Sequence, residues 1–256
     1  MIAHPVDIAT PDGAMDAYAA RPDGGGPFAL VVLFMDIWGL REELFAIARR
    51  IATRGYYCVV PNLYYREGAI RYERRNSAGQ MVSFHTLPAA LQEEMRAHAH
   101  ALTRAGVRSD VAAILDFCRG EPVDAGAAGS AGFCLGGRMA FIAGQEFPSR
   151  FRASASLHGT LLVTDAPDSP HRLVDRMRGE VYCGYGEHDR FAAPELLTAM
   201  ERAFAGRSAA RYRCNLHRGA DHGYSLPDRD VYDAAAADKD WDEIFAMFGR
   251  QLARAS

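Results

Sequence analysis

The 256-residue chain lacks several features that would place it in a membrane or direct it for secretion. Its longest clear apolar run, from Phe28 to Met35, is far too short to cross a bilayer. The segment from Met1 to Gly13 has no apolar stretch of the kind that a secretory signal peptide carries. Charges of both signs are interspersed and leave a net charge of −3. We therefore expect no membrane and no nucleic acid as a partner.

Cysteine is scarce, and its spacing excludes the common thiol-based structures. The five cysteines are odd in number and form no CxxC pair, and the chain has no HExxH motif. This pattern argues against a disulfide framework and against a zinc site, so we predict no metal and no cofactor. Free thiols suit a reducing compartment, and we expect a cytoplasmic protein. The cysteines are Cys58, Cys118, Cys134, Cys183 and Cys214.

Internal repeats and long linkers are absent as well, so we predict one α/β domain over residues 1–256. The pattern predicts a hairpin over residues 6–20 and buried strands over 28–34, 57–60 and 151–157. Helical periodicity is found over residues 107–118 and in a last helix that carries Trp241, Ile244 and Phe248. Residues 64–106 are polar, rich in arginine and only partly helical, which favours a role as a pocket wall.

One short motif points to chemistry. Residues 132–136 read Gly-Phe-Cys-Leu-Gly, a nucleophile-elbow pattern with cysteine at the centre. A sharp strand-to-helix turn needs glycine on both sides of a strained central residue. Such a turn presents the Cys134 sulfur and aims the Leu135 N–H at the place where an oxyanion would form. The motif alone is weak, because Cys134 could also be an ordinary buried thiol.

Two later loops complete the order nucleophile, acid, base that is typical of such triads. A predicted strand ending near Cys183 leads into a glycine-rich loop with Asp189, and another leads into a loop with His222. Glu187 and Asp221 are the rival acids, and we rank Asp221 last because it is adjacent to His222 in the chain. The carboxyl ends of parallel strands lie at one edge of a sheet, so these side chains can meet.

The sequence resembles the dienelactone hydrolase family of α/β-hydrolases over nearly the whole chain. The matching segments are residues 34–39, Gly55-Tyr56 with 60–64, 132–137, 184–189 and 219–223. The resemblance implies an α/β-hydrolase fold, with a mostly parallel central sheet and helices on both faces. It also implies a hydrolase that cleaves a lactone or carboxylic ester through a cysteine thioester.

The resemblance extends the site beyond Cys134, Asp189 and His222. Family members carry a glutamate at the position of Asp36, near the thiol, where it helps to form the thiolate. Aspartate is one methylene shorter, which puts direct contact with Cys134 in question, and the alternatives to a catalytic role are helix capping or an ion pair with Arg138. By its position after the first buried strand, Ile37 is expected to supply the second oxyanion N–H. We predict that Trp38, Tyr64, Tyr65, Arg66, Arg138 and His158 line the substrate pocket.

A second departure concerns the substrate. Family enzymes that cleave dienelactone hold its carboxylate with arginines, one of them four residues after the histidine, where this chain has Leu226. We therefore expect a neutral ester or lactone as the preferred substrate, and Leu226→Arg to shift the preference toward an anionic one. Alternatives are a broader esterase or thioesterase, or a non-hydrolytic binding or thiol-redox protein on the same fold. The pattern favours neither a monomer nor a homodimer.

Overall fold

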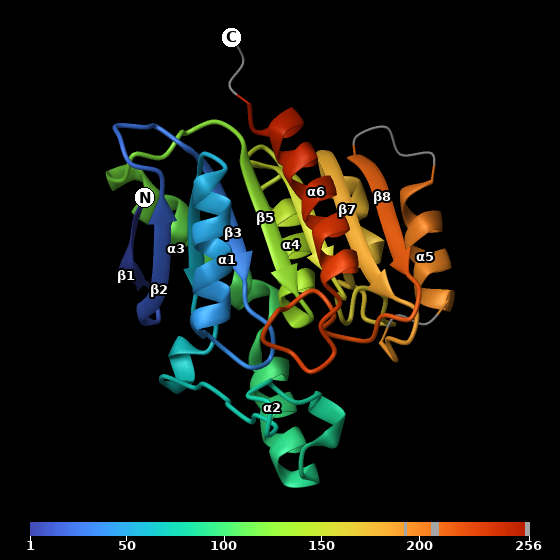
Figure 1. The fold of residues 1–256 in the computed structure, drawn as a ribbon. Coiled ribbons are helices and arrows are strands. Elements are labelled where there is room, and N and C mark those ends of the chain that lie inside the picture. The colour runs from blue at the N-terminus through green and yellow to red at the C-terminus, as the bar shows by residue number, and fades with distance from the viewer. Residues whose placement is uncertain (192–193, 206–209, 254–256) are drawn as a thin grey trace.

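Eight strands form one sheet in the order β1-β2-β4-β3-β5-β6-β7-β8 (Figure 1). The computed structural model describes residues 1–191, 194–205 and 210–253. Strands β1 and β2 form an antiparallel hairpin, and β2 also pairs antiparallel with β4. From β4 to β8 all neighbouring strands run parallel. The strands are β1 Ile2–Thr10, β2 Gly13–Arg21, β3 Ala29–Phe34, β4 Tyr56–Pro61, β5 Ala128–Phe133, β6 Phe151–Leu157, β7 Gly179–Gly186 and β8 Ala210–His217.

Helices cover both faces of this sheet. Helices α1 and α6 lie on one face, and α3, α4 and α5 lie on the other (Figure 1). Helix α2 lies beyond the carboxyl ends of the parallel strands, where it stands apart from the two layers. The helices are α1 Glu42–Thr53, α2 Ala89–Ala101, α3 Arg104–Phe117, α4 Leu135–Glu146, α5 Pro194–Phe204 and α6 Ala234–Gln251, with 3₁₀ turns at Tyr65–Glu67, Phe84–Thr86, Cys118–Gly120 and Pro170–Arg176.

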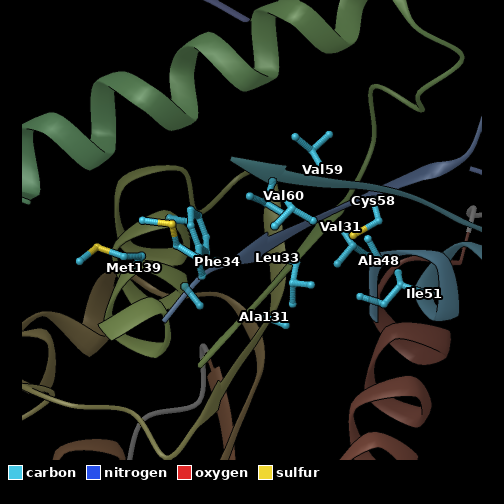
Figure 2. Packing of buried hydrophobic residues seen from close by; sticks show 14 of the residues in the cluster. Val31, Leu33, Phe34, Ala48, Ile51, Cys58, Val59, Val60, Ala131 and Met139 are labelled. Carbon is cyan, nitrogen blue, oxygen red and sulfur yellow. The ribbon is translucent and has the colours of Figure 1, made fainter. Parts of the chain in front are cut away.

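The core follows the two-residue period of the strands. Figure 2 shows Val31 and Leu33 of β3 on the side of α1, while Phe34 points toward Met139 of α4. All four of these side chains are buried almost completely. Because successive strand residues face opposite sides, a continuous apolar run such as β3 indicates a strand covered by helices on both faces. This packing fixes the ends of β3 and β5, which carry the site.

The predicted sheet with helices on both faces is confirmed. The segment 64–106, which was predicted only as partly helical, is where the structure adds most detail. That segment holds two 3₁₀ turns and the whole of α2, and its chain between residues 72 and 87 packs on the loop near residue 229. The Met81 N–H donates to the Asp228 carbonyl, and the Asp230 N–H donates to the Met81 carbonyl. Among the helices that the structure describes, none is both long and apolar enough to cross a bilayer.

Candidate active site

Cys134 lies in the sharp turn between β5 and α4. Its φ of 54° is a left-handed conformation that costs energy for a residue with a side chain. A Cβ on Gly132 would lie 2.1 Å from the carbonyl oxygen of Gly136, and one on Gly136 would lie 2.5 Å from that of Phe34. Both glycines are therefore required by backbone contacts, and the elbow predicted from the motif is present in the backbone.

Backbone hydrogen bonds hold this turn in place. The Cys134 N–H donates to Leu157 of β6, and the Cys134 carbonyl accepts from Gly137 and Thr160. Leu135 is the first residue of α4, so its N–H has no partner one turn earlier in the helix. Ile37 follows β3 and lines the same cavity as Cys134 and Leu135. The two backbone groups expected to hold an oxyanion thus lie at the ends of neighbouring strands beside the thiol.

His222 and Asp189 form a buried hydrogen-bonded pair. Nδ1 of His222 lies 2.7 Å from Oδ2 of Asp189, and the second oxygen, Oδ1, accepts from the Phe191 N–H at 2.8 Å. Asp189 is 4% exposed. With both of its oxygens bound, the carboxylate holds the imidazole in one orientation and one tautomer.

The rival acids bond elsewhere. Glu187 is exposed and accepts a hydrogen bond from the backbone of Gly219 at 2.9 Å. Asp221 turns back onto its own segment, where Oδ1 accepts from the His222 N–H at 2.6 Å. Neither carboxylate bonds to the imidazole in the part of the chain that the structure describes. The geometry therefore favours Asp189 as the partner of His222.

The charges around His222 favour its protonated form. Burial would lower the pKa of His222, but the Cys134 sulfur and the Asp189 carboxylate together raise it to about 10. An imidazolium beside the sulfur is the neighbour that a cysteine nucleophile needs, because the thiolate and not the thiol attacks a carbonyl carbon.

Asp36 has a different environment from the one expected. Its carboxylate is 1% exposed and forms a two-pronged ion pair with Arg41, at 2.7 and 3.0 Å, and not with Arg138. Oδ1 also accepts from the Trp38 N–H at 3.1 Å. Nε of Arg41 also donates to Oδ2 of Asp228 at 2.6 Å, and Nη1 of Arg229 lies 3.9 Å from Oδ2 of Asp36. The alternative of an ion pair with Arg138 is not observed, because Arg41 binds both carboxylate oxygens.

A cavity of about 300 Å³ opens above the thiol. It is at the lower end of the size range of small-molecule sites. Seven of the residues that the sequence singled out contribute to its wall: Asp36, Ile37, Trp38, Cys134, Leu135, Arg138 and His222. The other wall residues are mostly apolar, among them Phe84, Met139, Leu161, Val163, Phe191 and Leu196.

Four predicted pocket residues lie outside the cavity wall as the structure describes it. Tyr64 is buried beneath the wall, where its hydroxyl donates to the Ile37 carbonyl at 3.1 Å. Tyr65 and Arg66 bond to Asp110, at 3.0 and 2.7 Å, which holds them away from the thiol. His158 lies behind His222, with their ring centroids 4.9 Å apart. Ion pairing and packing place these four side chains outside the cavity wall. Both are tertiary effects, which the sequence pattern does not reveal.

Leu226 does not face the cavity either. It is fully buried in the main hydrophobic core, so an arginine there would bring an unpaired charge into apolar packing. Residue 226 is therefore not placed to contact a substrate carboxylate, and the preference for a neutral substrate stays a prediction. Three arginines, Arg96, Arg138 and Arg229, line the cavity, and the Nε atoms of Arg138 and Arg229 are buried without an acceptor among the described residues.

Several wall residues were not predicted individually. The segment 64–106 supplies Phe84, Arg96 and His100, in agreement with its expected role as a pocket wall. Leu161 and Phe191 are 46% and 43% exposed and form part of the rim. In the sequence, only the position of these two residues after β6 and β7 indicates that they belong to the wall, because loops at the carboxyl ends of parallel strands surround ligand sites.

Comparison with known proteins agrees with this architecture. The model of the dienelactone hydrolase family matches residues 15–252. A provisionally named carboxymethylenebutenolidase of Methylorubrum extorquens is 27% identical over 254 residues, covering 97% of this chain and 81% of the relative. A relative from Escherichia coli K12 with the same provisional name is 25% identical over 238 residues, covering 91% and 82%.

Solved structures give the same result. The crystal structure of a provisionally named dienelactone hydrolase from Klebsiella pneumoniae has a TM-score of 0.80 at 25% identity, covering 97% of this chain and 98% of the other. The family predicted from the motifs is thus confirmed. From the family match over residues 15–252 and the sheet that bears the elbow, the chain belongs to the dienelactone hydrolase family and is a hydrolase with the α/β-hydrolase fold.

Proposed function

We propose that the protein hydrolyses a lactone or carboxylic ester through the triad Cys134, His222 and Asp189. One observation carries the proposal: the thiol at the strained elbow and the bound imidazole line the same cavity, and Asp189 holds that imidazole from behind. A protein that only bound a ligand would have no use for a strained nucleophile paired with an oriented base.

In the first half of the reaction the thiolate of Cys134 attacks the substrate carbonyl carbon. A C–S bond forms, and the carbonyl π electrons move onto oxygen, where the N–H groups of Ile37 and Leu135 stabilise the oxyanion. The tetrahedral intermediate collapses and breaks the carbon–oxygen bond. The imidazolium of His222 gives its proton to the departing alkoxide, which stays attached to the acyl group when the substrate is a lactone.

In the second half the neutral imidazole of His222 removes a proton from water, and the hydroxide attacks the thioester carbon. Collapse of this second intermediate breaks the C–S bond and releases the acid. The proton stays on His222 beside the restored thiolate, so the site returns to its starting state. Asp189 stabilises the imidazolium in both halves through its 2.7 Å contact with Nδ1.

Asp36 acts in this proposal on the backbone and not on the thiol. Its bonds to the Trp38 N–H and to Arg41 enclose the short loop that carries Ile37. Tyr64 adds a bond to the carbonyl of Ile37 from below. The expected effect of these contacts is a preformed oxyanion site, since donors that need not reorganise stabilise charge most strongly.

The apolar wall supports an ester with an alkyl or aryl group as the substrate. Phe84, Leu161, Phe191 and Leu196 surround the space next to the thiol. A broad esterase or thioesterase activity fits the same wall and stays an alternative. A cytoplasmic location also stays a prediction, which rests on the five free cysteines.

The test is to mix the purified protein with p-nitrophenyl acetate and follow both product release and protein mass. We expect an acetyl adduct on Cys134 that forms and disappears as turnover proceeds, and no turnover with Cys134→Ala. Cys214→Ala is a matched control, because Cys214 is also incompletely buried but lies on β8 away from the cavity.

Two outcomes would contradict the proposal. Hydrolysis that survives in Cys134→Ala would move the nucleophile elsewhere. Stable binding of esters, lactones and thioesters with no adduct on Cys134 and no product would favour the ligand-binding alternative. A screen across these three substrate classes also separates a lactonase from a broad esterase.

A further inference from the structure

A second buried carboxylate lies behind the proposed triad. Asp240 of α6 is 0% exposed and accepts three hydrogen bonds from side chains. They come from the hydroxyl of Tyr182 at 2.5 Å, the hydroxyl of Tyr224 at 2.5 Å and Nε2 of His217 at 2.6 Å. None of these four residues lines the cavity, and the triad does not use them directly.

Two of the three donors bracket the loop that carries His222. His217 is the last residue of β8, and Tyr224 comes two residues after His222. Asp240 therefore joins both ends of this loop to α6 through one carboxylate. The third donor, Tyr182, lies within β7, and its hydroxyl also accepts from the amide of Asn215 in β8 at 2.9 Å, so it contacts the strand before the loop and not the loop itself.

The backbone of β7 leaves room for this arrangement. A Cβ on Gly184 would lie 2.4 Å from the Tyr224 hydroxyl and 2.5 Å from Oδ2 of Asp240. Any side chain at residue 184 would thus displace the Tyr224–Asp240 bond. The absence of a side chain at Gly184 is therefore what lets Tyr224 reach Asp240.

A stack of rings connects Tyr224 with the imidazole of His222. The ring centroids of Tyr224 and His158 are 5.5 Å apart, and those of His158 and His222 are 4.9 Å apart, both edge to face. Ser225, the neighbour of Tyr224, lies 2.9 Å from Nε2 of His158. Phe191 packs on His222 at 4.9 Å and completes its surroundings.

His158 is suited to this place because it stays uncharged. It is 1% exposed, and burial first, then the nearby charges of His222 and Arg229, lower its pKa well below the usual value. A neutral ring can lie against the imidazolium of His222 without repulsion. The same contact would be unfavourable for a charged side chain.

We propose that Asp240 is a positioning residue for His222: it fixes both ends of the histidine loop and, through Tyr224 and His158, the plane of the imidazole ring. The inference rests on the proposed function, in which His222 must face both the thiol and Asp189. A buried carboxylate is costly to desolvate, and the three hydrogen bonds that Asp240 accepts offset that cost. Small displacements of a catalytic group reduce turnover strongly.

The matched pair Tyr224→Phe and Tyr182→Phe tests the proposal. Each variant removes one hydroxyl that donates to the same carboxylate, but only Tyr224 is itself a residue of the histidine loop. We expect Tyr224→Phe to lower kcat for an aryl ester by about ten- to a hundredfold with KM changed by no more than about twofold. Tyr182→Phe should change kcat by no more than about twofold.

The rate of Cys134 alkylation by iodoacetamide gives a readout that does not need ester turnover. We expect slower alkylation at neutral pH in Tyr224→Phe and an unchanged rate in Tyr182→Phe, because a displaced imidazole stabilises the thiolate less. If the wild type hydrolyses no ester, the proposed function fails, while the alkylation rates still decide whether Asp240 positions His222.

His217 provides a second pair of variants should Tyr224→Phe fail to fold. His217→Leu removes the other donor at the loop, and we expect the same loss of kcat and of alkylation rate. His217→Gln keeps an N–H donor near Asp240 and should restore most of both. Equal losses in Tyr182→Phe and the loop variants, or losses that only follow the free energy of unfolding, would overturn the positioning role.

Discussion

Asp189 and Glu187 lie two residues apart on one loop, yet only the carboxylate of Asp189 bonds to His222. Asp189→Asn presents an amide that can favour the wrong imidazole tautomer. We expect a loss in kcat of about a thousandfold or more, whereas Glu187→Gln should cost less than about threefold. Steady-state kinetics on an aryl ester measures both. A larger loss in Glu187→Gln would move the acid of the triad to Glu187.

Arg138 is the cavity residue best placed to respond to substrate charge. It comes one turn after Cys134 on α4, its Nε has no acceptor among the described residues, and burial lowers its pKa. We expect Arg138→Met to reduce kcat/KM for a carboxylated aryl ester by about tenfold or more, the effect of losing a charged hydrogen bond. A neutral aryl ester should change by less than about threefold.

The same comparison in the wild type tests the expected preference for neutral substrates. That preference is supported if kcat/KM for the neutral ester exceeds that for the carboxylated one. The opposite order, together with its loss in Arg138→Met, would show that Arg138 holds the carboxylate of the substrate.

At the scale of elements, the turn between β5 and α4 depends on backbone contact. A Cβ on Gly136 would lie 2.5 Å from carbonyl oxygens of both Phe34 and Met35, which cannot move without shifting the end of β3. We expect Gly136→Ala to lower the free energy of unfolding by about 1–3 kcal/mol, the usual range for overpacking, and to abolish hydrolysis. Urea denaturation and an ester assay measure both effects.

Gly249 of α6 supplies the control for that substitution. It is exposed, and a Cβ there meets no atom of the described residues within 4 Å. Gly249→Ala should raise the free energy of unfolding by about 0.5–1 kcal/mol, because alanine favours a helix interior. Equal behaviour of the two variants would mean that the close contact at Gly136 has no energetic weight.

At the scale of the whole molecule, Glu180 connects three elements. This residue of β7 is 3% exposed and bonds to Arg250 and Gln251 of α6 and to Arg213 of β8. Bonds from Arg250, followed by those of Gln251 and Arg213, outweigh burial and lower the pKa of Glu180 to about 2. Its charged form therefore stabilises the fold above the ordinary glutamate pKa, near 4.5, and loses that effect as the pH falls toward 2.

Glu180→Gln should lower the free energy of unfolding by about 1–3 kcal/mol at neutral pH, since it leaves Arg250 and Arg213 without a charged acceptor at a buried position. The difference from the wild type should shrink steadily between pH 5 and pH 2. Urea denaturation over that range measures it. A difference that stays constant with pH would show that Glu180 acts through its shape and not through its charge.

The sequence by itself determined the sheet, the family and the order of the reactive residues. Continuous apolar strands such as β3 and the helical spacing of residues 241–248 are local patterns, and local backbone preference with burial was enough to predict them. The elbow was predictable for the same reason, because the close backbone contact between Gly132 and Gly136, on either side of Cys134, lies within five residues of sequence.

Only the tertiary structure decided which charged and aromatic side chains meet. Arg41 binds Asp36, Arg66 turns to Asp110, and His158 packs behind His222, although nothing in their spacing indicates these partners. Asp240 joins the histidine loop from the last helix. A buried charge takes the partner that the folded chain brings within about 3 Å, and that distance depends on the packing of elements far apart in sequence.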